Sequence, residues 1–304
     1  MQIMSLITAL PGAAAQGLIW GIMAIGVYIT FRILDIADLT VDGTLCTGGA
    51  VCIMMMLSGH NVWVSMLVAT GAGLLAGLAT GIFHTFMGIP AILAGILTQL
   101  SLYSVNLKIM GKANQAINVD KFNLLVSLRR VKGVSLTQNT LFIVAIMIVI
   151  LIAILYWFFG TELGCSLRAT GCNPSMSRAQ GINTDRNKVL ALMLSNGLVA
   201  LSGALLTQYQ GFADINMGRG SIVIGLAAVI IGEAIFSRIF RNFALKLLSV
   251  VFGSILYYLV LQIVIWMGID TDLLKMLSAL VVAFFLAFPY WKGKYFTKAK
   301  QGGK

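Results

Sequence analysis

The feature that most constrains this chain is a series of nine apolar segments, each close to the length of a membrane span. They occupy residues 12–31, 43–57, 62–82, 90–107, 139–160, 189–208, 221–236, 247–267 and 273–290. A helix needs about 20 apolar residues to cross the hydrocarbon core, so a chain of 304 residues holds about eight to ten spans. We therefore expect one all-α integral membrane domain over residues 1–304, with about nine transmembrane helices and no second globular domain.

The distribution of charge supports this class and excludes others. Only 10% of the residues are charged, against roughly 25% in soluble domains. The net charge of +11 comes from Lys and Arg at the ends of apolar segments, as the positive-inside rule produces, so nucleic-acid binding is excluded. The four cysteines and two histidines have no metal-ligand spacing, and no metal site is expected.

The same charges predict an orientation. With a cytosolic C-terminus, 13 of the 21 Lys and Arg lie inside and 8 outside, six of these in one long connection. This places the N-terminus outside, makes 108–138 an external connection, and makes 161–188 a cytosolic loop. Residues 291–304 become a basic cytosolic tail.

A short acidic stretch interrupts the apolar pattern. The sequence DIADLTVDGT, at residues 35–44, contains three of the ten Asp and Glu in the chain. The apolar segment that follows, 43–57, has only 15 residues, which is short for a span. Non-helical backbone is tolerated at membrane depth only where protein or water surrounds it. We therefore expect a broken or re-entrant helix near 35–57, at the centre of the protein.

The aspartates of this stretch allow two interpretations. Asp38 and Asp42 precede an apolar segment, so they either cap its free amides or contact a transported solute. Asp35 is expected to be solvated or paired with Arg32.

Two further spans carry informative patterns. Gly73, Gly77 and Gly81 recur every four residues and predict close helix packing, either within one subunit or between two. The span at 90–107 contains a polar run that includes Gln99 and Ser101. Such a run must face protein or water, so it either bonds to other helices or lines a pathway.

The cytosolic loop contains a helix-start signal. Asn173 can cap exposed amides, Pro174 suits the first helical position, and Gly181 is a natural stop. We therefore expect a short helix near 173–181. It is either an ordinary connector or a rigid peg docked into a cytosolic partner.

Three stretches in a fixed order resemble a known family. The stretch LGCSLRATGCNPSMSRAQGIN (163–183), with DLTVDG (38–43) and AAVIIG (227–232), is similar to permeases of the branched-chain amino acid and ribose ABC importer family. Glu233 replaces the second glycine that usually ends the third stretch, and we interpret it as an ion-pair or interface residue. The extra N-terminal span of sugar-importing members is absent. The chain is most similar to a subgroup linked with aromatic amino acid uptake.

The resemblance implies a function and partners. It implies a multi-pass permease of the bacterial inner membrane that pairs with a second copy, two ABC ATPases and an external solute-binding protein. The chain lacks a phosphate-binding P-loop, so it is not expected to be an enzyme; ATP and Mg²⁺ would bind the partner ATPase. The solute would be small and polar, with an amino acid favoured over a nucleoside or sugar.

The resemblance also assigns residues to two sites. The expected pathway between two permease copies is lined by Asp38, Thr40, Asp42, Thr44, Thr47, Gln99 and Ser101. The expected ATPase-coupling residues are Arg168, Gly171, Asn173, Pro174, Arg178, Gln180 and Gly181. The main alternative is an ion-coupled secondary transporter that uses Asp35, Asp38 and Asp42. A membrane enzyme, a scaffold subunit and an exporter are weaker alternatives.

Overall fold

The structure is a computed structural model in which nearly all described residues of the apolar segments are helical. It describes residues 2–118, 122, 124–131, 139–236, 239–240, 242–267 and a few positions between 273 and 287. The helices are α1 (Gln2–Tyr28), α2 (Val41–Leu57), α3 (Val62–Thr85), α4 (Ala91–Met110), α5 (Thr140–Gly160), α6 (Glu162–Cys172), α7 (Pro174–Ala179), α8 (Thr184–Gln210), α9 (Ser221–Phe236) and α10 (Phe243–Trp266). A π-helical turn (Ile29–Ile33) extends α1, and a 3-10 turn (Leu128–Val131) precedes α5.

Six of these helices are long and apolar enough to cross a membrane: α1 with its π-helical turn, α3, α4, α5, α8 and α10. Two apolar helices, α2 and α9, are shorter. The all-α membrane architecture is thus confirmed, and eight of the nine expected segments are helical. The ninth, 273–290, and the tail, 291–304, lie wholly or largely outside the described residues, so the total of nine spans stays a prediction.

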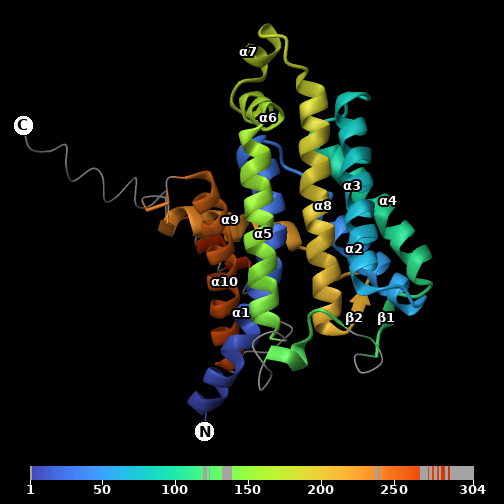
Figure 1. The fold of residues 1–304 in the computed structure, drawn as a ribbon, viewed down its shortest axis with the longest axis vertical. Coiled ribbons are helices and arrows are strands. Elements are labelled where there is room, and N and C mark those ends of the chain that lie inside the picture. The colour runs from blue at the N-terminus through green and yellow to red at the C-terminus, as the bar shows by residue number, and fades with distance from the viewer. Residues whose placement is uncertain are drawn as a thin grey trace, which may run out of the picture.

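The two ends of the molecule differ (Figure 1). At one end, near the N-terminus, strand β1 (Asn114–Ala116) pairs antiparallel with β2 (Phe212–Asp214), with Gln115 opposite Ala213. We call this the sheet end. At the other, the α7 end, α6 lies beyond the end of α5, and α7 lies outermost. The sequence analysis missed the sheet, because three-residue strands leave no periodicity, and it treated 162–172 as loop where α6 forms.

The helices form two halves of opposite direction. α1 packs against α10 and α9, and α8 packs against α3 and α2 in the same way. α1 and α8 also pack against each other. Ser195 bonds to the carbonyl of Gly26 and Tyr209 to that of Gly12, so α1 and α8 are antiparallel. The unit α1–α2–α3 therefore corresponds to α8–α9–α10 inverted, an arrangement that recurs in transporters.

Each half is interrupted at the same place by a similar sequence. Residues 37–40 read ADLT and lead into α2, and residues 213–216 read ADIN and lead into α9. In each, the aspartate side chain accepts a bond from the amide two residues on, Asp38 from Thr40 at 2.9 Å and Asp214 from Asn216 at 2.7 Å. The two short helices thus begin from equivalent turns, although the repeat is too short to stand out in the sequence.

The glycine stripe of α3 packs against α8 of the same chain. A Cβ atom on Gly73 would overlap Asn196 and Ala200, one on Gly77 would overlap the Leu192 carbonyl, and one on Gly81 would press on Val189. These contacts bring the two backbones together as close-packed membrane helices require.

Replacing Gly77 with alanine is expected to destabilise the protein by about 1–3 kcal/mol, because the methyl group must push α3 away from α8. Gly71 is the matched control, since a Cβ there meets no atom within 4 Å. Thermal unfolding in detergent compares the two variants. Equal transition temperatures for Gly71→Ala and Gly77→Ala would contradict this packing.

Candidate functional site

The site begins at the non-helical segment between α1 and α2. Asp38 is buried there at 2% exposure, and its second carboxylate oxygen accepts a 2.7 Å bond from the Asn196 amide on α8. The side-chain oxygen of Asn196 accepts a 2.7 Å bond from the Thr44 hydroxyl. Asn196 thus bridges the turn before α2 to its first helical turn, and the broken helix is held by protein groups as its burial requires.

A line of threonines extends this network to two more helices. The Thr40 hydroxyl lies 2.7 Å from that of Thr80 on α3, and Thr80 donates a 2.9 Å bond to Thr98 on α4. All three side chains are buried. The network therefore fixes the start of α2 relative to α3, α4 and α8 together. Fully satisfied polar networks of this kind specify one arrangement of the helices around them.

Asp42 acts on a different helix from the one expected. Instead of capping α2, its carboxylate accepts bonds from the amides of Gly220 and Ile222 and from the Ser221 hydroxyl, at 2.9, 3.0 and 2.8 Å. These groups form the start of α9, whose free amides favour an anion. The first turns of α2 and α9 therefore meet at Asp42, and from there the helices run to opposite ends of the molecule. The expectation that Asp42 caps α2 is therefore wrong: it caps α9 instead.

A groove of about 350 Å³ opens beside this meeting point. Its size falls within the range of small-molecule sites. Its polar lining comes from the starts of both interrupted helices and from one face of α4. The lining residues are Asp42, Gly43, Cys46, Gln99, Leu100, Tyr103, Asn106, Ile215 and Arg219.

The remaining predicted pathway residues lie elsewhere. Asp38, Thr40 and Thr44 belong to the buried network, whereas Thr47 and Ser101 line a mostly apolar hollow of about 310 Å³ between α2, α3 and α4. Only Asp42 and Gln99 of the predicted set reach the polar groove. The structure therefore divides the predicted pathway into a groove surface and a supporting network.

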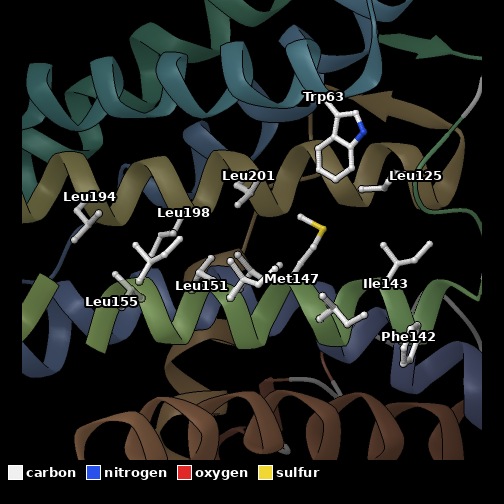
Figure 2. Close-up of a pocket in the computed structure, with 14 residues that line it drawn as sticks. Trp63, Leu125, Phe142, Ile143, Met147, Leu151, Leu155, Leu194, Leu198 and Leu201 are labelled. Carbon is white, nitrogen blue, oxygen red and sulfur yellow. The ribbon is translucent and has the colours of Figure 1, made fainter. Parts of the chain in front are cut away.

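A larger hollow than the polar groove does not suit a polar solute. It has a volume of about 660 Å³ and lies mainly between α5 and α8, where Leu194, Leu198 and Leu201 face Met147 and Leu151 (Figure 2). Apart from Trp63, every side chain that lines it is aliphatic, phenylalanine or methionine. A solute with charged groups would find no partner there.

At the α7 end, the predicted short helix is present with its predicted cap. The Asn173 side chain accepts a 3.0 Å bond from the Met176 amide, and Pro174 opens the helix. Gly181 follows with φ of +82°, a conformation that glycine adopts readily. Most of α7 is exposed, including Met176, and so is Gln180, which follows the helix. Arg178 bonds to Thr184 at 3.0 Å, so this side chain ties α7 to the start of α8.

Two of the predicted coupling residues on α6 contact other elements of the same chain. Arg168 donates a 2.9 Å bond to the carbonyl of Phe159, near the end of α5. A Cβ atom on Gly171 would overlap the carbonyl oxygen of Ile33, so the α6 backbone contacts the π-helical turn directly. Asn187 of α8 donates a 2.8 Å bond to Thr170. α6 is therefore fixed to α1, α5 and α8 at once.

The ion pair at this end differs in part from the expectation. Arg32 pairs with Glu233 at 3.0 Å and joins the π-helical turn to α9, whereas Asp35 is exposed and has no ion-pair partner in the described part of the chain. The reading of Glu233 as an ion-pair residue agrees with this contact.

Sequence reasoning missed two residues of the site, Asn196 and Arg219. Asn196 is a polar residue within an apolar span, a signal that was available and was not followed. Asn106 belongs to the polar run at 90–107, which was expected to bond to other helices or to line a pathway. Arg219 was counted only as an outer charge, and nothing local in the sequence pairs it with Asp42.

Interrupted helices that meet between inverted halves define a class, that of multi-pass membrane transport proteins. Comparison of the sequence with known protein families identifies one member of this class. Residues 10–286 match the family described as branched-chain amino acid transport system / permease component. The chain belongs to this family, which confirms the resemblance found in the sequence, and it is a transport subunit rather than an enzyme.

Individual relatives agree with the family match. The chain is 38% identical over 272 residues to a tyrosine transport system permease protein of Clostridioides difficile, covering 90% of this chain and 88% of the relative. It is 38% identical over 281 residues to an uncharacterised protein of Rickettsia prowazekii, covering 91% and 95%. A fructose import permease protein of Bifidobacterium longum is 26% identical over 246 residues, covering 81% and 67%. No solved structure matches the chain.

Proposed function

We propose that the chain is the permease subunit of an ATP-driven ABC importer and forms the translocation path for an amino acid delivered by an external binding protein. The observation that carries the proposal is the contact of Gly171 with Ile33. It places α6, and α7 beyond it, against the last turn before the interrupted segment that contains Asp38. Movement of α7 can thereby reach the centre of the permease.

The proposal fixes an orientation. The α7 end faces the cytosol and the sheet end faces outward, with the N-terminus outside, 108–138 as external connection and 161–188 as cytosolic coupling loop. The tail, 291–304, is then cytosolic. The exposed surface of α7 docks on an ABC ATPase, which binds ATP and Mg²⁺. Stiff elements with two positions couple such a motor to the membrane helices.

A second copy of the permease completes the path. α4 is exposed over much of its length and carries polar side chains on the exposed surface, including Ser101, Tyr103 and Ser104. Polar surface within a span requires cover by protein or water. A homodimer that joins these surfaces encloses the groove between two copies. Two ATPases and one binding protein complete the importer.

An amino acid is the solute class we favour. One relative of high identity and coverage is a tyrosine transport system permease protein. Relatives of lower identity include a fructose import permease and an autoinducer 2 import permease, so family membership alone leaves the solute open. Identification by mass spectrometry of the ligand on the co-purified binding protein tests the solute class. A sugar as the only ligand would contradict it.

Met176→Asp is expected to reduce recovery of the ATPase with the tagged permease by about tenfold or more, because an aspartate replaces an apolar side chain that is 59% exposed on the proposed docking surface. Lys112→Glu, an exposed charge change at the sheet end, is the control. Co-purification from membranes measures both variants. Equal recovery of the ATPase would remove α7 as the docking element.

A further inference from the structure

The groove beside Asp42 contains polar groups that the fold itself does not use. The Arg219 guanidinium has no hydrogen-bond or ion-pair partner among the described residues. Asn106 is 1% exposed, and its side-chain oxygen has no hydrogen-bond partner in the described part of the chain. A buried acceptor without a donor costs free energy, and its persistence at the wall of a groove points to a ligand that supplies the donor.

Asp42 has acceptor capacity left as well. An ionised carboxylate offers about four lone-pair sites, and the start of α9 occupies three of them. Asp42 and Asn106 line the same groove. Two acceptors, one of them charged, suit an ammonium group, which has three donors and no acceptor.

Arg219 provides the opposite chemistry. Arg219 immediately precedes Gly220, whose amide bonds to the Asp42 carboxylate. The cation and the anion therefore line the groove close to each other. A guanidinium is suited to bind a carboxylate through two parallel bonds. Groups of both signs in one groove of amino-acid size match a zwitterion better than a sugar or a simple ion.

We propose that this groove binds the backbone of an amino acid in transit, with Arg219 on the α-carboxylate and Asp42 and Asn106 on the α-ammonium. The solute side chain lies along Tyr103, which is 42% exposed and offers a ring to an aromatic solute. The inference deepens the proposed function and rests on it.

The test uses the complete importer in proteoliposomes and a thiol reporter in the groove. Leu100→Cys places the thiol at the groove wall, in a background where the groove residue Cys46 is changed to alanine and the exposed Cys165 and Cys172 to serine. L-tyrosine is the probe and tyramine, which lacks the carboxylate, is its matched analogue. We expect L-tyrosine to slow modification of the thiol by N-ethylmaleimide and tyramine to do so about tenfold less effectively.

Arg219→Gln is expected to abolish the difference between L-tyrosine and tyramine in protection of the thiol. Arg219→Lys is expected to keep part of that difference. Lys108→Gln, a nearby exposed cation outside the groove, should leave the difference unchanged. Equal protection by both compounds in the wild type, or an unchanged difference in Arg219→Gln, would overturn the assignment.

Uptake separates this failure from failure of the proposed function. ATP-dependent uptake of a labelled amino acid mixture by the wild-type importer reports the proposed function alone. If uptake occurs while the groove variants behave as wild type, the proposed function stands and the site is elsewhere. If no amino acid enters, the solute class is wrong and the site assignment falls with it.

Discussion

Replacing Asn196 with leucine is expected to lower the free energy of unfolding by about 3–5 kcal/mol and to abolish transport. Leucine has a similar size, so the main loss is of hydrogen bonds. The variant leaves one oxygen of the buried Asp38 carboxylate without its 2.7 Å donor, and it removes the shorter of the two acceptor contacts of the Thr44 hydroxyl, which keeps the Thr40 carbonyl at 3.1 Å. Thermal or denaturant unfolding in detergent measures the stability, and uptake measures the function.

Two further variants isolate the cause. Asp38→Asn in the Asn196→Leu background removes the uncompensated charge and should recover part of the lost stability. Ser202→Ala deletes another buried hydroxyl of α8, which bonds to the Ile19 carbonyl, and should cost only about 1 kcal/mol. If Asn196→Leu lowered the free energy of unfolding no more than Ser202→Ala, the stabilising role of the Asp38–Asn196 network would be contradicted.

Replacing Gly171 with valine is expected to uncouple ATP hydrolysis from transport. The added side chain overlaps the Ile33 carbonyl and separates α6 from the π-helical turn of α1. Because α7 stays exposed and capped, the ATPase should still bind and hydrolyse ATP. The solute transported per ATP hydrolysed should fall by about tenfold or more, since even small misplacements at a functional contact have effects of that order.

Gly160→Ala is the control for this variant, because a Cβ at this position near the end of α5 meets no atom within 4 Å. This variant should transport as much solute per ATP hydrolysed as the wild type. A wild-type ratio in Gly171→Val would show that movement of α7 reaches the centre by another route. Loss of the ATPase from the purified complex would instead place Gly171 at the docking surface itself.

Local signals allowed much of the fold to be predicted. Eight apolar segments became helices because span length is set by the bilayer. Asn173, Pro174 and Gly181 form the start and stop that their chemistry indicates. The interruption before α2 followed from the shortness of its apolar segment. Each of these features depends on residues close together in the sequence.

What could not be predicted depends on contacts between distant segments. Asp42 caps a helix that begins 179 positions later, and no local pattern distinguishes that role from a cap on α2. Gly171 was expected at a partner surface, yet the helix of which it is part turns it against Ile33. The groove needs α2, α4 and the turn before α9 together, so its residues became a set only in three dimensions.

The most direct test of the central claim, ATP-driven import through this permease, is uptake of the binding protein's ligand by the reconstituted complex. ATP would be supplied on the α7 side, and ionophores would collapse all ion gradients. We predict uptake that requires ATP and persists in the presence of ionophores. Uptake that continues without ATP and stops when the gradients collapse would contradict the claim and identify an ion-coupled transporter that uses the aspartates of residues 35–44.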